Sequence, residues 1–370
     1  MNRTSNIKVI ISGGGTGGHI FPAISIAGEL RKKEPASEIL FVGAEGKMEM
    51  ELVPREGYRI VGLPVEGIDR KNLLRNFAIL CRLRRSLRMA GSIINEFRPD
   101  VVVGVGGFAS GPVLRRAGRM GIPTLIQEQN SYAGVTNRLL ASKASAICVA
   151  YDGMERFFPA GKIIKTGNPV RRDLRNLDSL RKEALEYFKL KEGLPVVLVL
   201  GGSLGAGSIN RSLSEDIGKI AGSGCQWLWQ TGKHYHSDVK GIVERSAAPN
   251  ISLHAFINRM DLAYAAADVV ISRAGAGTIS ELSLAGKPAI LVPSPNVAED
   301  HQTSNARALS VRDAAILLPD DQVPGRLVDE AASLAADYER KETMAGNISA
   351  MALPGAGERI AEEIIKLAGK

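Results

Sequence analysis

A glycine-rich run, GGGTGGH at residues 13–19, most constrains the folds open to this chain. It follows an apolar stretch at 7–12, typical of a buried strand, and precedes a helical pattern over 22–30. Glycines allow a sharp turn and let the backbone approach a ligand closely. The amides that open a helix favour an anion beside them. The run therefore predicts a strand, loop and helix that bind an anion next to His19, whose imidazole titrates near neutral pH.

This loop is open to more than one interpretation. Gly13, Gly15 and Gly18 match the G-x-G-x-x-G pattern of dinucleotide-binding folds, so a dehydrogenase is one hypothesis. That pattern also needs an acidic residue about twenty positions further on, and the nearest candidate, Glu45, comes late. The sequence contains no G-x-x-x-x-G-K-[ST], which excludes a P-loop. A purely structural turn is the other alternative, although such a turn has no need of a histidine.

Strand and helix patterns alternate along the whole chain, which predicts an α/β protein with doubly wound parallel sheets. Several of the strands are continuous apolar runs, as expected for parallel strands that are buried on both faces. The break at 167–169 (Gly-Asn-Pro) separates two similar halves. We therefore expect domains at 1–166 and 167–354 that face each other across a cleft, and a C-terminal helix within 355–370 that packs back on the first domain. The predicted strands are 7–12, 38–43, 58–62, 100–104, 123–127 and 145–150, then 195–201, 225–230, 250–254, 268–272, 288–293 and 314–318.

Composition limits the partners. The chain has 370 residues, a net charge of +8 and three scattered cysteines, typical of reduced core thiols in a cytoplasmic protein. The first 170 residues hold 24 Lys and Arg against 14 Asp and Glu, a net charge of +10, which indicates an anionic partner. Aromatic residues are only 5% and no recognition motif is present, so we expect no nucleic acid partner. No apolar run is long enough to span a membrane.

The segment 70–97 favours a membrane surface as the anionic partner. Seven basic residues and no acidic one lie between Arg70 and Arg88. Apolar residues recur at helical spacing on one face, with arginines on the other, which is typical of a basic amphipathic helix on a membrane. A core helix with a solvated basic face is the alternative, and it accounts for most of the leucines. The apolar face holds Leu73, Phe77, Leu80, Leu83 and Leu87, and the basic face holds Arg75, Arg82 and Arg85.

Glycines and polar residues gather where predicted strands end. They occupy 104–108, 127–130, 201–206, 272–281 and 296–302. Ligands bind outside the carboxyl ends of strands in sheets of this kind, so we expect these segments to line one cleft. The helix that opens near 276 leaves its amides for a diphosphate. No D-x-D pattern or metal-ligand cluster occurs, so we expect no metal cofactor and assign the leaving-group charge to the helix dipole.

The ordered set of motifs resembles the undecaprenyldiphospho-muramoylpentapeptide N-acetylglucosaminyltransferases of glycosyltransferase family 28. The resemblance runs from about residue 7 to the C-terminal helix, and the order of the motifs makes it specific. It rests on GGTGGH at 14–19, Gly-Gly at 106–107, QEQN at 127–130, GNPVR at 167–171, GGSLGA at 201–206 and the run 275–281.

This resemblance implies the GT-B fold of two Rossmann-like domains, with an acceptor-binding, membrane-associating first domain and a UDP-GlcNAc-binding second domain. It implies transfer of GlcNAc from UDP-GlcNAc to lipid I, which gives lipid II for peptidoglycan. The expected location is peripheral, on the cytoplasmic face of the bacterial inner membrane, with other cell-wall synthesis proteins as possible partners.

The resemblance also implies the site residues. Ser203 and the helix from Ala276 would hold the diphosphate, the backbone of Ile257 would meet uracil, and Glu281 would take the ribose hydroxyls. Phe108 stands where the family often has Tyr, and Gly277 replaces a larger apolar residue. The donor set is Thr16, Gly17, Gly18, Asn130, Arg171, Ser203, Ile257, Ala276, Gly277, Thr278, Ile279, Ser280, Glu281 and Gln302, and the acceptor set is Gly14, Gly15, Gly106 and Gly107.

The implied reaction inverts the anomeric carbon in one displacement and therefore needs a general base. His19 is the first candidate and Glu128 the second, while His19 could instead orient the loop or bind acceptor phosphate. Another lipid glycosyltransferase, such as one acting on diacylglycerol, is the alternative enzyme. A nucleotide-sugar-binding protein without turnover is the alternative from another class.

Overall fold

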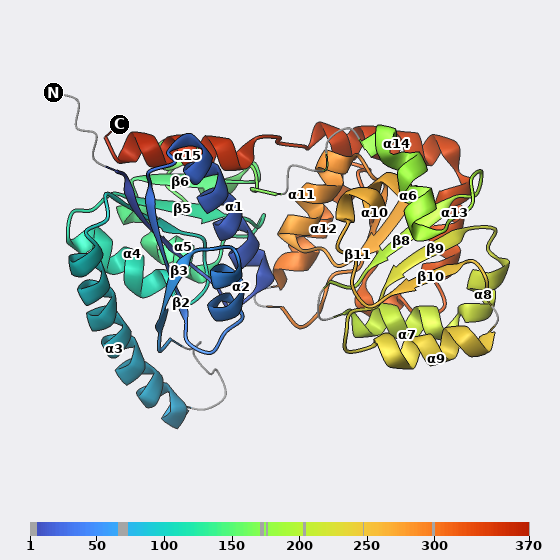
Figure 1. Cartoon of the computed structure of the whole chain (residues 1–370), viewed down its shortest axis with the longest axis horizontal. Helices are drawn as coiled ribbons and strands as arrows, with labels where there is room; N and C mark the ends of the chain where they lie inside the picture. Colours follow the sequence, from blue (N-terminus) through green and yellow to red (C-terminus); the bar gives the residue numbers. More distant parts are fainter. Residues whose placement is uncertain are drawn as a thin grey trace. The chain divides into compact units, whose positions relative to one another are not determined.

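The computed structural model describes residues 6–65, 73–170, 174, 177–202, 205–246, 248–297 and 300–369. The chain divides into two compact units. Unit 1 comprises Met1–Val170 with Leu353–Lys370, and unit 2 comprises Arg171–Ala352 (Figure 1). The expected boundaries after residues 166 and 354 lie close to these.

Unit 1 contains a seven-stranded parallel sheet in the order β3-β2-β1-β4-β5-β6-β7. The chain moves outward in one direction from β1 to β3 and then returns to place β4 on the other side of β1. The order therefore reverses between β1 and β4, and ligands in sheets of this kind bind at the carboxyl ends beside such a reversal. The strands are β1 (Lys8–Ser12), β2 (Glu38–Ala44), β3 (Arg59–Leu63), β4 (Val101–Gly104), β5 (Thr124–Glu128), β6 (Ala146–Val149) and β7 (Ile163–Lys165).

Helices cover both faces of this sheet (Figure 1). Val9 and Ile11 of β1 pack into the hydrophobic cluster on one face, and Ile10 packs into the cluster on the other. The predicted burial of these strands on both faces is therefore confirmed. The helices are α1 (Gly17–Lys33), α2 (Glu49–Arg55), α3 (Leu73–Phe97), α4 (Ser110–Arg119), α5 (Val135–Leu140) and α15 (Ala356–Leu367).

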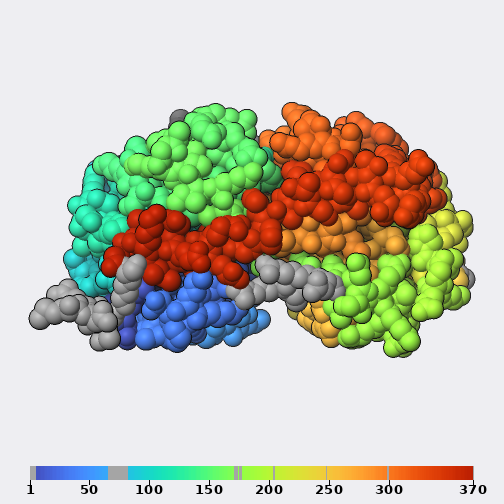
Figure 2. All heavy atoms as spheres, turned by 90° about the horizontal axis from the view of Figure 1, so that it is seen from above, coloured from blue at the N-terminus to red at the C-terminus, as the bar shows by residue number. Residues whose placement is uncertain are grey.

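The C-terminal helix α15 packs on α1. Ile360 and Ile364 are buried in the same cluster as Ile26 of α1. Lys33 and Glu362 form an ion pair of 2.7 Å between the two helices. Figure 2 shows this helix, in red, along the surface beside the blue N-terminal elements. The last residues of the chain therefore complete the core of unit 1.

Unit 2 repeats the design with six parallel strands in the order β10-β9-β8-β11-β12-β13, so its reversal lies between β8 and β11. Its strands are β8 (Val196–Leu200), β9 (Gln226–Gln230), β10 (Ile251–His254), β11 (Val269–Ser272), β12 (Ala289–Leu291) and β13 (Ile316–Leu317). Its helices are α6 (Arg181–Phe188), α7 (Gly207–Glu215), α8 (Ile217–Gly222), α9 (His236–Ser246), α10 (Met260–Ala266), α11 (Ala276–Ala285), α12 (His301–Ser310), α13 (Leu327–Ala336) and α14 (Tyr338–Ala350).

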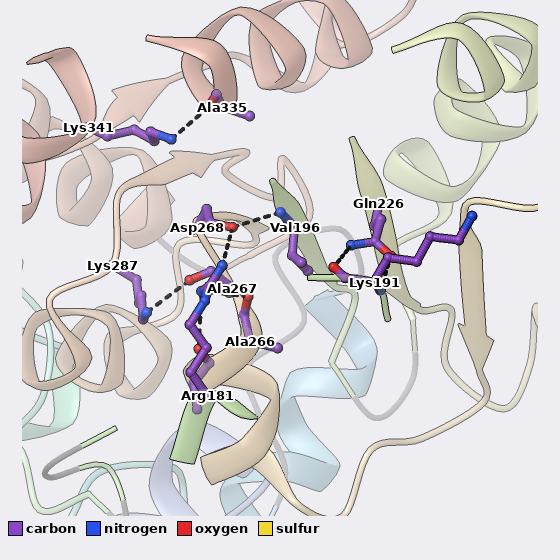
Figure 3. A network of polar contacts seen from close by, with 11 residues as sticks. Arg181, Lys191, Val196, Gln226, Ala266, Ala267, Asp268, Lys287, Ala335 and Lys341 are labelled. Atoms are coloured by element: carbon purple, nitrogen blue, oxygen red, sulfur yellow. Dashed lines mark hydrogen bonds and ion pairs between the residues drawn. The ribbon is translucent and has the colours of Figure 1, made fainter. Parts of the chain in front are cut away.

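A polar network secures the amino ends of the central strands of unit 2 (Figure 3). Asp268 Oδ2 accepts the N–H of Val196 at 2.8 Å and an Arg181 N–H at 3.0 Å. Nearby, Lys287 Nζ donates to the carbonyl of Ala267 at 2.9 Å, and burial lowers the pKa of this lysine. These contacts lie at the end of the sheet opposite the glycine-rich loops, so they stabilise the sheet without occupying its carboxyl ends.

Candidate functional site

The two glycine loops of unit 1 pack backbone against backbone. They follow β1 and β4, which pair in parallel with Ser12 opposite Gly104. A Cβ on Gly107, where φ is +82°, would lie 2.3 Å from the carbonyl oxygen of Gly14. A Cβ on Gly13 would lie 2.2 Å from the side chain of Val105. Because a side chain at either position would collide with the other loop, glycine is required here.

His19 lies in the first turn of α1, between the two loops. The ring nitrogen Nδ1 of His19 is 3.2 Å from the hydroxyl oxygen of Thr16. The backbone N–H of His19 donates to the Thr16 carbonyl at 3.1 Å. A Cβ on Gly106 would lie 2.9 Å from Nε2 of the imidazole. The ring is therefore held at one nitrogen by Thr16 and lies with the other against the Gly106 backbone. Its neighbours Thr16 and Gly18 are exposed.

Glu128, the second candidate base, ends β5 and is buried. Its Oε2 accepts the Gly134 N–H at 3.0 Å and the amide of Asn137 at 2.8 Å. Its Oε1 accepts the N–H of Asn130 at 3.0 Å and the Asn130 side-chain amide at 3.3 Å. Burial raises the pKa of Glu128, and these four hydrogen bonds oppose that shift. The carboxylate thus organises the turn that leads from β5 into α5.

Two further motif segments of unit 1 support each other. Gln127 donates to Asn168 Oδ1 at 3.0 Å, and Asn168 donates to the Gln129 carbonyl at 3.0 Å. Gln129 in turn donates to the carbonyl of Val105 at 2.8 Å. All three amide side chains are buried. The QEQN and GNP motifs therefore brace the strand ends behind the loop that follows β4.

In unit 2, helix α11 begins directly at the carboxyl end of β11. Gly275 precedes it in an extended conformation, and a Cβ on Gly277 would meet nothing within 4 Å. The first-turn amides have no carbonyl partner within the helix, and small residues leave room for a ligand there. Ala276 and Ile279 are buried, while Thr278 is half-buried. This arrangement is suited to an anion such as a diphosphate.

The polar side chains of α11 have defined neighbours. Glu281 accepts a hydrogen bond of 3.1 Å from the hydroxyl of Tyr264, which is fully buried in α10. The hydroxyl of Ser280 donates to the Ala276 carbonyl at 3.0 Å. The ring of Tyr264 therefore sets the position of the Glu281 carboxylate one turn into the helix.

Other residues of the expected donor set contact the strand-end loops of unit 2. The backbone N–H of Ile257 donates to Gln230 Oε1 at 2.9 Å. A nucleobase could therefore bind the backbone carbonyl of Ile257 without displacing Gln230. Gln302 Oε1 accepts the Ser294 N–H at 2.8 Å. Arg171 and Ser203 lie outside the described residues.

Several residues of these sites were missed by the sequence analysis. Arg273 donates to the carbonyls of Val292 and Pro293 at 3.2 Å and to the hydroxyl of Ser208 at 2.8 Å, and it pairs with Asp320. It thereby joins the carboxyl ends of β11 and β12 to α7. Glu49, Asn137 and Tyr264 were missed as well. Arg273 could have been found from the sequence, because it directly follows a predicted strand. Glu49 could not, because an acidic residue in the first turn of a helix is too common to indicate a site.

Two further features of the described residues concern metal ions and membranes. Among the described residues, no three His, Cys, Asp or Glu side chains are grouped so that they could hold a metal ion. Within the same residues, no helix is both long enough and apolar enough to cross a bilayer.

Two doubly wound domains with glycine loops at the reversals of their strand order define the GT-B fold. The glycosyltransferase family 28 N-terminal domain matches residues 9–149, and the family 28 C-terminal domain matches 196–360. The chain therefore belongs to glycosyltransferase family 28.

Two relatives of nearly the same length are named for the same activity. A protein of Parabacteroides distasonis is 56% identical over 363 residues, which cover 98% of this chain and 99% of the relative. One of Porphyromonas gingivalis is 56% identical over 99% of this chain and 97% of the relative. Both are named UDP-N-acetylglucosamine–N-acetylmuramyl-(pentapeptide) pyrophosphoryl-undecaprenol N-acetylglucosamine transferase. The crystal structure of Acinetobacter baumannii MurG is similar, with a TM-score of 0.78 and 27% identity over 97% of this chain and 99% of that one.

Replacing Gly107 by alanine tests the contact between the loops. We expect Gly107→Ala to destabilise unit 1 by more than about 2 kcal/mol, because it adds a backbone collision to the cost of a positive φ. Gly121→Ala is the matched control, since Gly121 has φ +74° but open space around its Cβ position. Chemical unfolding measures both variants. Equal losses for the two would show that the loops tolerate a side chain.

Proposed function

We propose that this protein transfers GlcNAc from UDP-GlcNAc to the C4 hydroxyl of the muramoyl unit of lipid I, producing lipid II. The observation that carries the proposal is the identity of more than half of the residues, over nearly the full length, with relatives named for this transfer. The sites of both units supply the groups that the reaction needs.

Unit 2 would bind the donor. The amides at the start of α11 would accept the diphosphate, and Glu281, placed by Tyr264, would accept hydrogen bonds from the ribose hydroxyls. Ile257 would meet uracil through its backbone. Gln302, together with Ser203 and Arg171, would complete the contacts to sugar and phosphate.

Unit 1 would bind the acceptor and provide the base. The oxygen of the C4 hydroxyl attacks the anomeric carbon, the bond from that carbon to the diphosphate oxygen breaks, and UDP leaves with the electron pair. His19 Nε2 takes the hydroxyl proton, because Thr16 holds the other ring nitrogen. We assign Glu128 a positioning role, since each of its two carboxylate oxygens already accepts two hydrogen bonds.

Charge on the departing UDP would be stabilised by the α11 amides and the helix dipole. Donors held in place before the reaction starts need no reorganisation as the charge develops. We therefore propose that transfer needs no metal ion.

Transfer of labelled GlcNAc to a lipid I analogue, with EDTA present, tests the proposed donor site. We expect wild type to remain active and Glu281→Ala to raise the KM for UDP-GlcNAc by about 10- to 100-fold, the loss of one or two hydrogen bonds to a charged group. Tyr264→Phe should raise it less. Glu342→Ala, an exposed acid of the same unit, is the control and should leave KM unchanged.

Each failure in this assay has its own meaning. Tight binding of UDP-GlcNAc without transfer to lipid I would point to a different acceptor, such as diacylglycerol. Activity abolished by EDTA and restored by a divalent cation would contradict the metal-independent leaving group.

We further propose that unit 1 docks on the anionic cytoplasmic face of the inner membrane through α3. Leu83 is 41% exposed and lies among the exposed Arg82, Arg84 and Arg85. Further along the helix, Ala90 and Ile94 are buried. They follow Leu83 by seven and eleven residues and so lie on the same side of the helix. The apolar face of α3 is therefore exposed at Leu83, with arginines beside it, as membrane docking requires. Side chains of 73–81 lie outside the described residues.

Sedimentation with vesicles tests this docking. We expect wild type to bind phosphatidylglycerol vesicles more tightly than phosphatidylcholine vesicles, because each basic residue near an anionic surface adds about 1 kcal/mol. Leu83→Glu should weaken that binding by about tenfold or more. Val311→Glu, which alters a 71% exposed valine in unit 2, is the matched control and should have no effect. Equal binding by the two variants would contradict docking through α3.

A further inference from the structure

A buried carboxylate lies behind the glycine loop of unit 1. Glu49, the first residue of α2, is only 1% exposed. Its Oε1 accepts the N–H of Ala44 at 2.9 Å, at the end of β2. The N–H of Gly15 lies 3.1 Å from Oε1 and 3.0 Å from Oε2, so it donates to both oxygens. Glu49 thus ties the loop to the strand beside it.

The surrounding glycines leave room for this side chain. A Cβ on Gly14 would lie 2.1 Å from Glu49 Oε1, and one on Gly43 would lie 2.6 Å from Glu49 Cγ. A carboxylate removed from water is costly unless hydrogen bonds compensate it, and backbone amides of the loop supply those bonds. The loop and the acid therefore constrain each other.

The constraint extends from Glu49 to His19 through direct contacts. Gly14, held against the carboxylate, packs its backbone on Gly107 of the second loop. The neighbouring Gly106 packs against the imidazole of His19. Because Gly14 and Gly107 touch through their backbones, a shift of the first loop moves the second loop, and Gly106 passes that shift to the ring.

The hydrogen bond from the Gly15 N–H to Glu49 also determines which backbone amides of the loop can face a ligand. The N–H of Gly15 is used by Glu49, and the N–H groups of His19 and Ile20 donate to the Thr16 carbonyl. An anion that binds at this loop therefore meets the remaining first-turn amides of α1, those of Gly17 and Gly18. A loop released from Glu49 would turn Gly15 toward the ligand instead.

We propose that Glu49 is a positioning residue for glycosyl transfer, which holds the glycine loop so that His19 meets the acceptor. This inference rests on the proposed function. A role confined to capping α2 is the alternative, and it would affect stability without a specific effect on turnover.

The test compares Glu49→Gln and Glu49→Asp with wild type. Gln keeps the size of the side chain but places an NH₂ group against a backbone donor, and Asp keeps the charge but is too short to reach Gly15. Asp100→Asn is the matched control, because Asp100 accepts the N–H of Lys8 at 2.8 Å at the opposite end of β1. The measurements are kcat, the KM for UDP-GlcNAc, and amide hydrogen exchange of the peptide covering 13–20.

We expect both Glu49 variants to lower kcat by about 100-fold, the cost of a misplacement on the order of 1 Å, with the KM for UDP-GlcNAc unchanged. Amide hydrogen exchange should rise in the peptide 13–20 and not elsewhere in unit 1. The control Asp100→Asn should change neither kcat nor this exchange. Unchanged kcat and exchange would overturn the proposal. So would exchange that rises uniformly across unit 1, with kcat falling only as folded protein is lost. Wild type inactive on lipid I would instead refute the proposed function, while the exchange data would still test the role of Glu49 in the loop.

Discussion

The parallel pairing of β1 with β4 is the constraint on which the rest of unit 1 depends. It places two glycine loops side by side, with Gly107 against the backbone of Gly14. That contact leaves no space for side chains, so the glycines are required sterically, and the imidazole of His19 packs against Gly106 of the second loop. The same reversal of strand order recurs in unit 2 between β8 and β11, where α11 opens. In each unit, the candidate site thus lies at the reversal of strand order.

Much of this architecture could be predicted from the sequence. Apolar runs such as 101–103 and 196–200 indicated strands buried on both faces, and the structure has them at these places. The edge strand β7 was missed because three residues carry too little pattern beside a Gly-Asn-Pro break. The role of Glu49 was missed because its partners Ala44 and Gly15 are joined to it only by the fold. Likewise, helical spacing placed Leu83 on the apolar face of its helix, but only the structure shows that this part of the face is exposed.

The two units meet different chemical demands with the same fold. Unit 2 presents helix amides and one carboxylate placed by Tyr264, a set suited to a nucleoside diphosphate. Unit 1 presents a titratable imidazole held by Thr16 and glycine backbone. Its carboxylates, Glu49 and Glu128, are buried and engaged by backbone amides, so they shape loops rather than face solvent. On this account the proton moves on unit 1 and the leaving-group charge develops on unit 2.

The most direct test of that division is the pH dependence of kcat for wild type and His19→Ala, with saturating lipid I analogue and UDP-GlcNAc. The account predicts that kcat falls by about 10²- to 10⁴-fold in the variant across the pH range measured. The KM for UDP-GlcNAc should stay unchanged, because His19 is not among the expected donor residues. A variant that loses less than about tenfold in kcat would show that another group takes the proton.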